Sequence, residues 1–257
     1  MRAREGRTGG PRLRLHPSSA VTVVVLTSAL ALGLLPVTAA DRAPAWYWLG
    51  GLAVALAFLA CVVVHEIAHA LAARRHGVGT ERITLWLLGG VAERDSEAPG
   101  PRADAVIAVA GPAASVLTGA VFWAVALVAQ PMLAPVPLAS LLWLGTANLL
   151  LALVALLPGS PLDGGRLVRA LVWARTGDRA RGERVARRCG RVIGVLLLAG
   201  GAVEVILFGQ FVGIWLSVLG WLVLGTRTLP APGRERVAAG GPPPAGRSAA
   251  VGGPGPA

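Results

Sequence analysis

The sequence has 257 residues, of which 54% are hydrophobic and only 14% are charged, whereas a soluble globular domain carries about 25% charged residues. The formal net charge is +11 at pH 7, and every basic residue is arginine. These values exclude an ordinary soluble enzyme and indicate a polytopic membrane protein with room for one membrane domain and short tails. A nucleic-acid-binding domain would need a folded, basic, aromatic-rich soluble surface, so we expect no nucleic-acid partner.

Six apolar stretches approach the roughly 20 residues that a helix needs to cross a bilayer. They are residues 21–39, 46–73, 105–130, 138–157, 192–208 and 211–226. We therefore predict an all-α polytopic membrane protein with about six transmembrane helices, in a membrane domain over residues 20–228. A basic cytosolic tail over residues 1–19 precedes this domain. A Pro/Gly-rich tail over residues 229–257, which we expect to be disordered, follows it.

The arginines predict the orientation of these spans. The segments that would be cytosolic hold five, five, nine and four arginines, whereas the exterior segments hold Arg42 alone. Because Lys and Arg concentrate in cytoplasmic loops, we expect both termini, and the end of the second span, on the cytosolic side of the cell membrane. Trp46, Tyr47 and Trp48 open the second span and are predicted to form an aromatic anchor at the interface.

Residues 83–92, between the second and third spans, predict two short strands joined by a turn at Gly89-Gly90. The segment is too apolar for an exposed hairpin and too short to span a bilayer. We predict a small membrane-associated β-hairpin or sheet after the second helix, because open strand edges facing lipid are not tolerated. Such an edge could receive an extended substrate by strand addition. A plain buried loop is the alternative.

The last third of the second span contains the run His65-Glu66-Ile67-Ala68-His69. Residues four apart share one face of a helix, so His65 and His69 can offer two imidazoles to one metal ion. H-E-x-x-H on a helix is the pattern of zinc hydrolases, in which the glutamate accepts a proton from water. Ionisable groups inside a membrane helix are costly and therefore usually functional, which disfavours a purely structural role for all three.

A zinc hydrolase site needs a third protein ligand and leaves the fourth position for water. Three residues are candidates: His76, Glu93 and Asp163. His76 lies one position too late for the H-E-x-x-H-x-x-G-x-x-H pattern, and Glu93 lies beside other charges in a solvated segment. Asp163 is the only carboxylate between Asp104 and Asp178, in a Gly/Pro-rich turn of the kind tolerated at membrane depth where it lines a cavity. We favour Asp163 and predict one Zn²⁺ per chain.

Two motifs together resemble the site-2 protease family of intramembrane zinc metalloproteases. They are the H-E-I-A-H run and the later Leu162-Asp163-Gly164-Gly165-Arg166. The resemblance covers roughly residues 45–175 and is strongest to the compact bacterial branch that includes the sporulation sigma-factor processing protease. It extends to Leu88-Gly89-Gly90-Val91-Ala92 and to Ala110-Gly111-Pro112, whose small residues also predict a face for close helix packing.

The resemblance implies that His65, His69 and Asp163 bind zinc and that Glu66 is the catalytic base. Members of the family cleave transmembrane segments of other proteins, often anti-sigma factors or membrane-tethered regulators, in regulated intramembrane proteolysis. The expected partners are therefore a single-span membrane protein substrate and the lipid bilayer. The active site is expected near the cytosolic leaflet.

One departure from the family pattern bears on substrate handling. Ala155 stands where the family commonly has an asparagine, eight residues before the metal-binding aspartate. Asn148 lies on the same helical face but about 10 Å away, too far to take over that role directly. The alternative function is therefore a non-catalytic metal-binding protein that holds clients without cutting them. Intact Glu66 favours the enzyme over this alternative. A third interpretation, a metal transporter, is less well supported because the other spans hold few polar residues.

Overall fold

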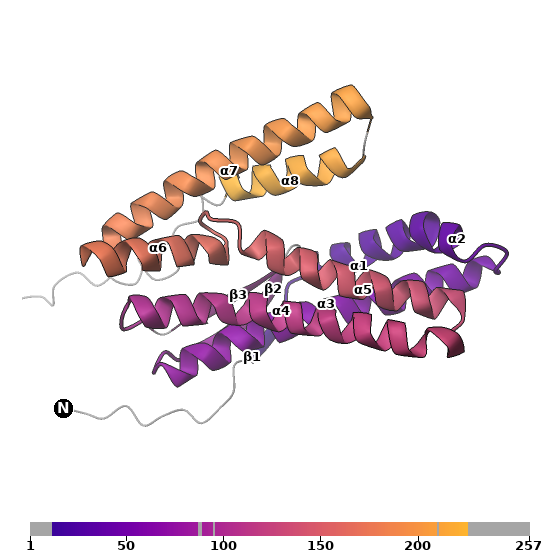
Figure 1. Cartoon of the computed structure of the whole chain (residues 1–257), viewed down its shortest axis with the longest axis horizontal. Coiled ribbons are helices and arrows are strands. Elements are labelled where there is room, and N and C mark those ends of the chain that lie inside the picture. The colour runs from indigo at the N-terminus through magenta and orange to yellow at the C-terminus, as the bar shows by residue number, and fades with distance from the viewer. Residues whose placement is uncertain (1–11, 87–88, 95, 210, 226–257) are drawn as a thin grey trace, which may run out of the picture. The chain divides into compact units, whose positions relative to one another are not determined.

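The computed structural model describes residues 12–86, 89–94, 96–209 and 211–225, and most of them are helical (Figure 1). In chain order the helices are α1 (Ser18–Ala29), a π-helical segment (Leu30–Leu34), α2 (Leu35–Thr38), α3 (Pro44–Arg75), α4 (Pro101–Ala129), a 3-10 segment (Gln130–Met132), α5 (Pro135–Ala155), α6 (Asp163–Thr176), α7 (Arg179–Phe208) and α8 (Phe211–Gly225). The strands are β1 (Arg12–Leu15), β2 (Thr80–Trp86) and β3 (Gly89–Arg94). The predicted tails, residues 1–19 and 229–257, lie mostly outside these ranges, since residues 1–11 and 226–257 are not described.

Five helical stretches in the described ranges are long and apolar enough to cross a membrane. They are Ser18–Thr38, Pro44–Arg75, Pro101–Met132, Pro135–Ala155 and Arg179–Phe208. The sixth predicted span falls on α8, which has 15 residues and is shorter than the roughly 20 that a bilayer requires. The protein is thus a mostly helical, multi-pass membrane protein with five long apolar helices and one short one in its described part.

The prediction differs most from the structure at α7. The sequence pattern placed a span over residues 192–208 after a separate basic segment, but α7 runs unbroken for 30 residues from Arg179. Asp178 caps this helix, because its carboxylate accepts a hydrogen bond from the backbone N–H of Arg181 at 3.0 Å. Gly177, with φ of 70°, ends α6 in the left-handed conformation that glycine adopts readily. The arginine-rich start of α7 hid its continuity with the apolar part.

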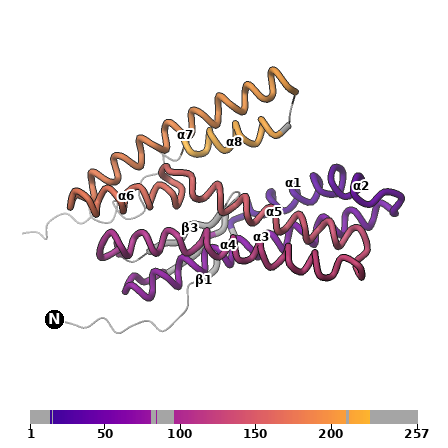
Figure 2. Tube along the Cα trace, in the orientation of Figure 1, coloured from indigo at the N-terminus to yellow at the C-terminus, as the bar shows by residue number. Residues whose placement is uncertain are grey.

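α3, α4 and α5 form the bundle that holds the candidate site. Figure 2 follows these helices as a tube and, like Figure 1, shows α4 and α5 side by side. They approach closely at two glycines, since a Cβ on Gly119 would lie 2.8 Å from the backbone oxygen of Gly145. Small residues of this kind allow helix backbones to pack closely in a membrane protein.

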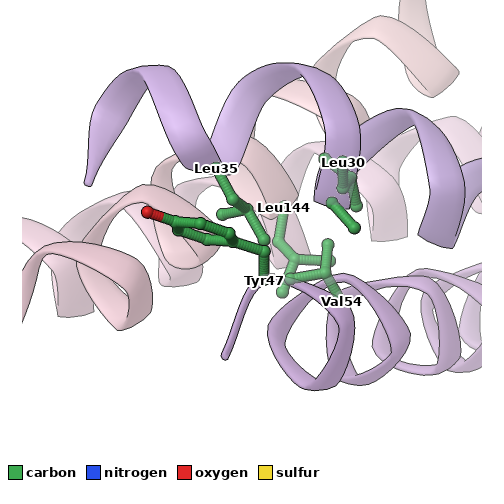
Figure 3. Close-up of a cluster of buried hydrophobic side chains, with 6 residues drawn as sticks. Leu30, Leu35, Tyr47, Val54 and Leu144 are labelled. Carbon is green, nitrogen blue, oxygen red and sulfur yellow. The ribbon is translucent and has the colours of Figure 1, made fainter. Parts of the chain in front are cut away.

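A buried apolar cluster joins the first helical span to α3 and α5 (Figure 3). Its buried residues are Leu30, Ala31, Leu35, Tyr47, Val54 and Leu144. Tyr47 is only 9% exposed, and its hydroxyl donates a hydrogen bond to the backbone oxygen of Ala39 at 2.7 Å. Trp46 and Trp48, by contrast, are 62% and 44% exposed. Tyr47 therefore belongs to the core, because a buried backbone acceptor satisfies its hydroxyl, and not to an outward-facing anchor.

The three strands form one sheet in the order β1-β2-β3. β2 and β3 pair antiparallel, with Leu85 opposite Gly90 and Trp86 opposite Gly89. Both glycines therefore lie in β3, and the prediction of a turn at Gly89-Gly90 is wrong. β1 comes from the predicted basic tail and pairs parallel with β2, which the sequence analysis did not anticipate. Association of the sheet with the membrane stays a prediction.

Candidate active site

His65 and His69 lie one turn apart on the same face of α3. Both side chains are buried, with exposed fractions of 5% and 3%, and their Nε2 atoms are 3.2 Å apart. The i,i+4 spacing thus brings two imidazole nitrogens to one point inside the helical bundle. An unpaired buried polar group is unfavourable, so this convergence calls for a shared partner.

Asp163 provides that partner from the first turn of α6. Its Oδ2 lies 3.0 Å from Nε2 of His69 and 3.4 Å from Nε2 of His65, although His69 and Asp163 are 94 residues apart in the sequence. Tetrahedral zinc with bonds of about 2.0–2.1 Å places its ligand atoms roughly 3.3 Å apart. The three donor atoms therefore have the spacing of a metal-ligand set. In the described part of the chain, no other group of three His, Cys, Asp or Glu residues has such a spacing.

The far nitrogen of each imidazole also has a partner. Nδ1 of His69 donates a hydrogen bond to the backbone oxygen of Ile107 at 2.6 Å, and Nδ1 of His65 lies 2.9 Å from Oγ of Ser115. A carbonyl oxygen can only accept, so the proton of neutral His69 resides on Nδ1 and its Nε2 keeps a lone pair for a metal. Both partners come from α4, which therefore orients the imidazoles through their Nδ1 atoms while the Nε2 atoms face Asp163.

Gly111 lets α4 reach the two imidazoles. A Cβ at this position would lie 2.6 Å from Nε2 of His65 and would collide with Nε2 of His69. Only glycine leaves this space open without moving the helices apart. The small-residue face predicted around Ala110-Gly111-Pro112 is thus the surface against which the histidines pack.

The carboxylate of Asp163 is held in its ionised form. Burial raises the pKa of this carboxyl, but its contacts with the imidazoles of His65 and His69 and the positive charge of Arg166 lower it more, so the pKa lies well below its usual range. Nη1 of Arg166 is 3.7 Å from Oδ1 of Asp163. A metal-binding carboxylate must be deprotonated, and this environment meets that requirement.

Asp104 is a buried charge that the sequence analysis did not single out. It lies near the start of α4, is 1% exposed, and accepts hydrogen bonds from Nε and Nη2 of Arg169 at 2.8 Å each. Nη2 of Arg166 lies 3.4 Å from the same carboxylate. This two-pronged pair ties α4 to α6, the helix that begins with Asp163. Two features of the sequence could have indicated this pair: a carboxylate directly before an apolar stretch, and two arginines three residues apart in a later amphipathic helix.

The remaining candidates fall in different places. Glu66 is buried in α3, directly after His65. His76 lies outside the group, because its Nδ1 pairs with the backbone oxygen of Ala72 at 2.9 Å and it ends α3. Glu93 lies in β3, and its side chain falls outside the described ones. Of the two candidates for a third ligand whose side chains the structure describes, His76 and Asp163, it brings Asp163 to the histidines.

Asn148 and Ala155 both lie on the buried side of α5. The side-chain amide of Asn148 donates a hydrogen bond to the backbone oxygen of Leu144 at 2.8 Å, so it is engaged with its own helix. Ala155 is the last residue of α5 and has no polar side chain. At position 155 the end of α5 therefore presents a methyl group and not a side-chain amide.

Comparison with known proteins identifies the family. The profile of peptidase family M50 matches residues 53–137 and 132–199, a region that includes both histidines and Asp163. A zinc metalloprotease named Rip3, from Mycobacterium tuberculosis, is 44% identical over 219 residues, which are 85% of this chain and 56% of that protein. The chain belongs to peptidase family M50. The resemblance inferred from the two sequence motifs is thereby confirmed.

Two further comparisons give a consistent picture. A zinc metalloprotease named sll0528, from Synechocystis, is 36% identical over 178 residues, which are 69% of this chain and 46% of that protein. The chain thus spans about half the length of these curated relatives. The solved site-2 protease of Methanocaldococcus jannaschii has a similar fold, with a TM-score of 0.57 and 24% identity over 85% of this chain and 91% of that one.

Proposed function

We propose that this M50 protein is an intramembrane zinc metalloendopeptidase that cleaves transmembrane segments of membrane-tethered proteins. One observation carries the proposal: ligand atoms of His65, His69 and Asp163 lie within 4.8 Å of one another. They do so in a protein built from long apolar helices. Family membership supports the reading, since the matched relatives are named zinc metalloproteases.

The side chains of the site have separate roles in this proposal. His65, His69 and Asp163 hold one zinc ion, which when bound polarises the scissile carbonyl and lowers the pKa of water. Glu66 accepts the proton of the attacking water on its carboxylate and hands it to the leaving amine. Its neighbour His65 lies 2.9 Å from the Ser115 hydroxyl through Nδ1, and the base shares one stretch of α3 with the two histidine ligands.

The proposed substrate is a single-span membrane protein, such as an anti-sigma factor or another membrane-tethered regulator. The arginine distribution supports cytosolic termini and a site near the cytosolic leaflet, with the protease domain over residues 20–228 and tails on both sides. β3 is an edge strand of the described sheet. An edge strand can pair with an extended substrate segment, which suggests how an unwound transmembrane segment is held for cleavage.

The proposal is tested by comparing wild type with Glu66→Gln in detergent. Each protein is incubated with single-span test substrates of both orientations, and its zinc content is measured. We expect about one zinc in both proteins, with cleavage by wild type and a loss of roughly 10²–10⁴-fold in the variant. His76→Gln is the matched control, because this histidine of the same chain region lies outside the ligand group and the change should leave zinc content and cleavage unaltered.

Two other results would redirect the assignment. Zinc in both proteins without cleavage of any substrate would favour the alternative function, a client-binding protein that keeps its metal. Absence of zinc from the wild-type protein would overturn the ligand set of His65, His69 and Asp163 together with the mechanism.

A further inference from the structure

The position of Asp163 depends on an irregular segment of chain. α5 ends at Ala155 and α6 starts at Asp163, so the turn of residues 156–162 decides where the carboxylate lies. The backbones of the two histidines, by contrast, are placed by the regular geometry of α3. Contacts that hold this turn therefore bear directly on the third ligand.

α7 holds the turn through backbone contacts. The backbone N–H of Ser160 donates a hydrogen bond to the backbone oxygen of Ala186 at 3.0 Å. One helical turn further along α7, a Cβ on Gly190 would collide with the backbone oxygen of Ser160. On the other side, a Cβ on Gly159 would lie 2.7 Å from the backbone nitrogen of Gly190. The turn and α7 can approach this closely only because positions 159 and 190 are both glycine.

The same turn passes the contact on to α6. A Cβ on Gly165 would lie 2.6 Å from the backbone oxygen of Gly159, and Gly165 is only two residues after Asp163. The backbone of α7, the turn and the first helical turn of α6 are therefore stacked in direct contact. With no side chains between them to adjust, a displacement at Gly190 is transmitted to the carboxylate.

α7 also holds the second turn of α6. A Cβ on Gly182 would lie 2.5 Å from the backbone oxygen of Arg169, and Nη1 of Arg169 is 3.5 Å from a carboxylate oxygen of Glu183. Arg169 in turn pairs with buried Asp104. α6 is thus fixed at two points along its length by a helix that contributes no metal ligand.

We propose that α7 positions the third metal ligand and that Gly190 is the positioning residue, acting through the Gly159-Ser160 turn on Asp163. The inference rests on the proposed ligand set and deepens it. Changes in groups that orient metal ligands typically alter metal affinity by about 10–100-fold. A displaced turn at Gly190 should have an effect of this size on zinc affinity.

The test compares Gly190→Ala with Gly200→Ala. Both glycines lie in α7, and both changes bring the same gain in helix propensity, but a Cβ on Gly200 has no atom within 4 Å. The zinc dissociation constant is measured by competition with a chelator, and the absorption spectrum of the cobalt-substituted protein reports the ligand geometry. We expect Gly190→Ala to bind zinc about 10–100-fold more weakly with an altered cobalt spectrum, and Gly200→Ala to match wild type.

The thermal stability of the zinc-free proteins separates positioning from general damage. A lower melting temperature of zinc-free Gly190→Ala, with unchanged zinc affinity and an unchanged cobalt spectrum, would overturn the inference. If Gly190→Ala yields no folded protein, Glu183→Gln loosens the second hold at a half-buried position. It should weaken zinc binding about threefold or more, and unchanged affinity would overturn the inference. A wild-type protein without zinc would instead overturn the proposed function itself.

Discussion

The two halves of the candidate site are built in different ways. His65 and His69 are one turn apart in α3, so helix geometry places both on one face, where their Nε2 atoms are 3.2 Å apart. Asp163 starts another helix 94 residues after His69 and reaches the same point through contacts with α4 and α7. The α3 half of the site, His65 and His69, is thus specified by neighbours in the sequence. The α6 half, Asp163, is specified by the packing of segments that are distant in the sequence. Substitutions far from the metal should therefore act mainly on the α6 half.

The largest effect should come from removing a ligand of either half. His69→Ala and Asp163→Ala each take one of three donors from a site whose total metal-binding free energy is typically about 10–16 kcal/mol for structural zinc sites. We expect zinc affinity to fall by roughly a thousandfold in both variants, with cleavage below detection. Metal content after dialysis against a weak chelator measures this. Full zinc retention by Asp163→Ala would show that the two halves do not share one ion.

The next largest effect should follow from breaking the buried pair between Asp104 and Arg169, whose closest atoms are 2.8 Å apart. Asp104→Asn removes the buried charge of this pair and leaves the half-buried guanidinium of Arg169 only the longer contact with Glu183 at 3.5 Å. Breaking a buried pair typically destabilises a protein by up to about 3–5 kcal/mol. Thermal unfolding in detergent measures the loss, and zinc affinity should fall as well because α6 loses its tie to α4. The exposed pair of Arg184 with Asp178, at 3.5 Å, supplies the control, since Arg184→Gln should leave both properties unchanged. Equal effects of the two substitutions would argue against the distinction between the halves.

A smaller effect is expected within the α3 half. Ser115→Ala removes the hydroxyl that lies 2.9 Å from Nδ1 of His65, and loss of such an orienting partner typically weakens metal binding by about 10–100-fold. Chelator competition measures the change. Ser115→Thr keeps the hydroxyl and should retain most of the affinity. If both variants behave like wild type, the histidine is held by α3 alone.

The smallest effect should be confined to stability. Tyr47→Phe removes the hydrogen bond to Ala39 at 2.7 Å in the apolar cluster of Figure 3, which typically lowers the free energy of unfolding by about 1 kcal/mol. Zinc affinity should stay at the wild-type value, because neither the cluster nor the residues packed against it include a proposed zinc ligand. A change in zinc affinity would contradict the proposed independence of the two regions.

The same division explains what could be predicted from the sequence. The i,i+4 spacing of His65 and His69 is local, so a short stretch of sequence was enough to pair them. Asp163 was proposed as the third ligand by a chemical argument, because an isolated carboxylate in a Gly/Pro-rich turn at the end of an apolar span is costly unless it has a function. Its actual distance from the imidazoles depends on α7, whose contacts leave no periodic mark in the sequence.

Other features could not be predicted because they depend on contacts between segments that are distant in the sequence. The partners of the imidazoles, Ser115 and the backbone oxygen of Ile107, come from a helix 50 and 38 residues further along the chain. A backbone oxygen has no signature in a sequence, and a single serine in an apolar helix is unremarkable until its neighbour is known. Helix lengths were missed where composition changes within one helix, as in α7, which is basic at its start and apolar afterwards.

The separation of His69 and Asp163 along the chain has a thermodynamic consequence. In the proposed holoenzyme, one ion closes a loop of 94 residues, and ligands that bind only the folded chain stabilise it by mass action. Each tenfold rise of free zinc above the dissociation constant then adds about 1.4 kcal/mol to the folded state. Bound zinc would therefore stabilise the fold as well as take part in the chemistry. The free energy of unfolding would then report the concentration of free zinc around the protein.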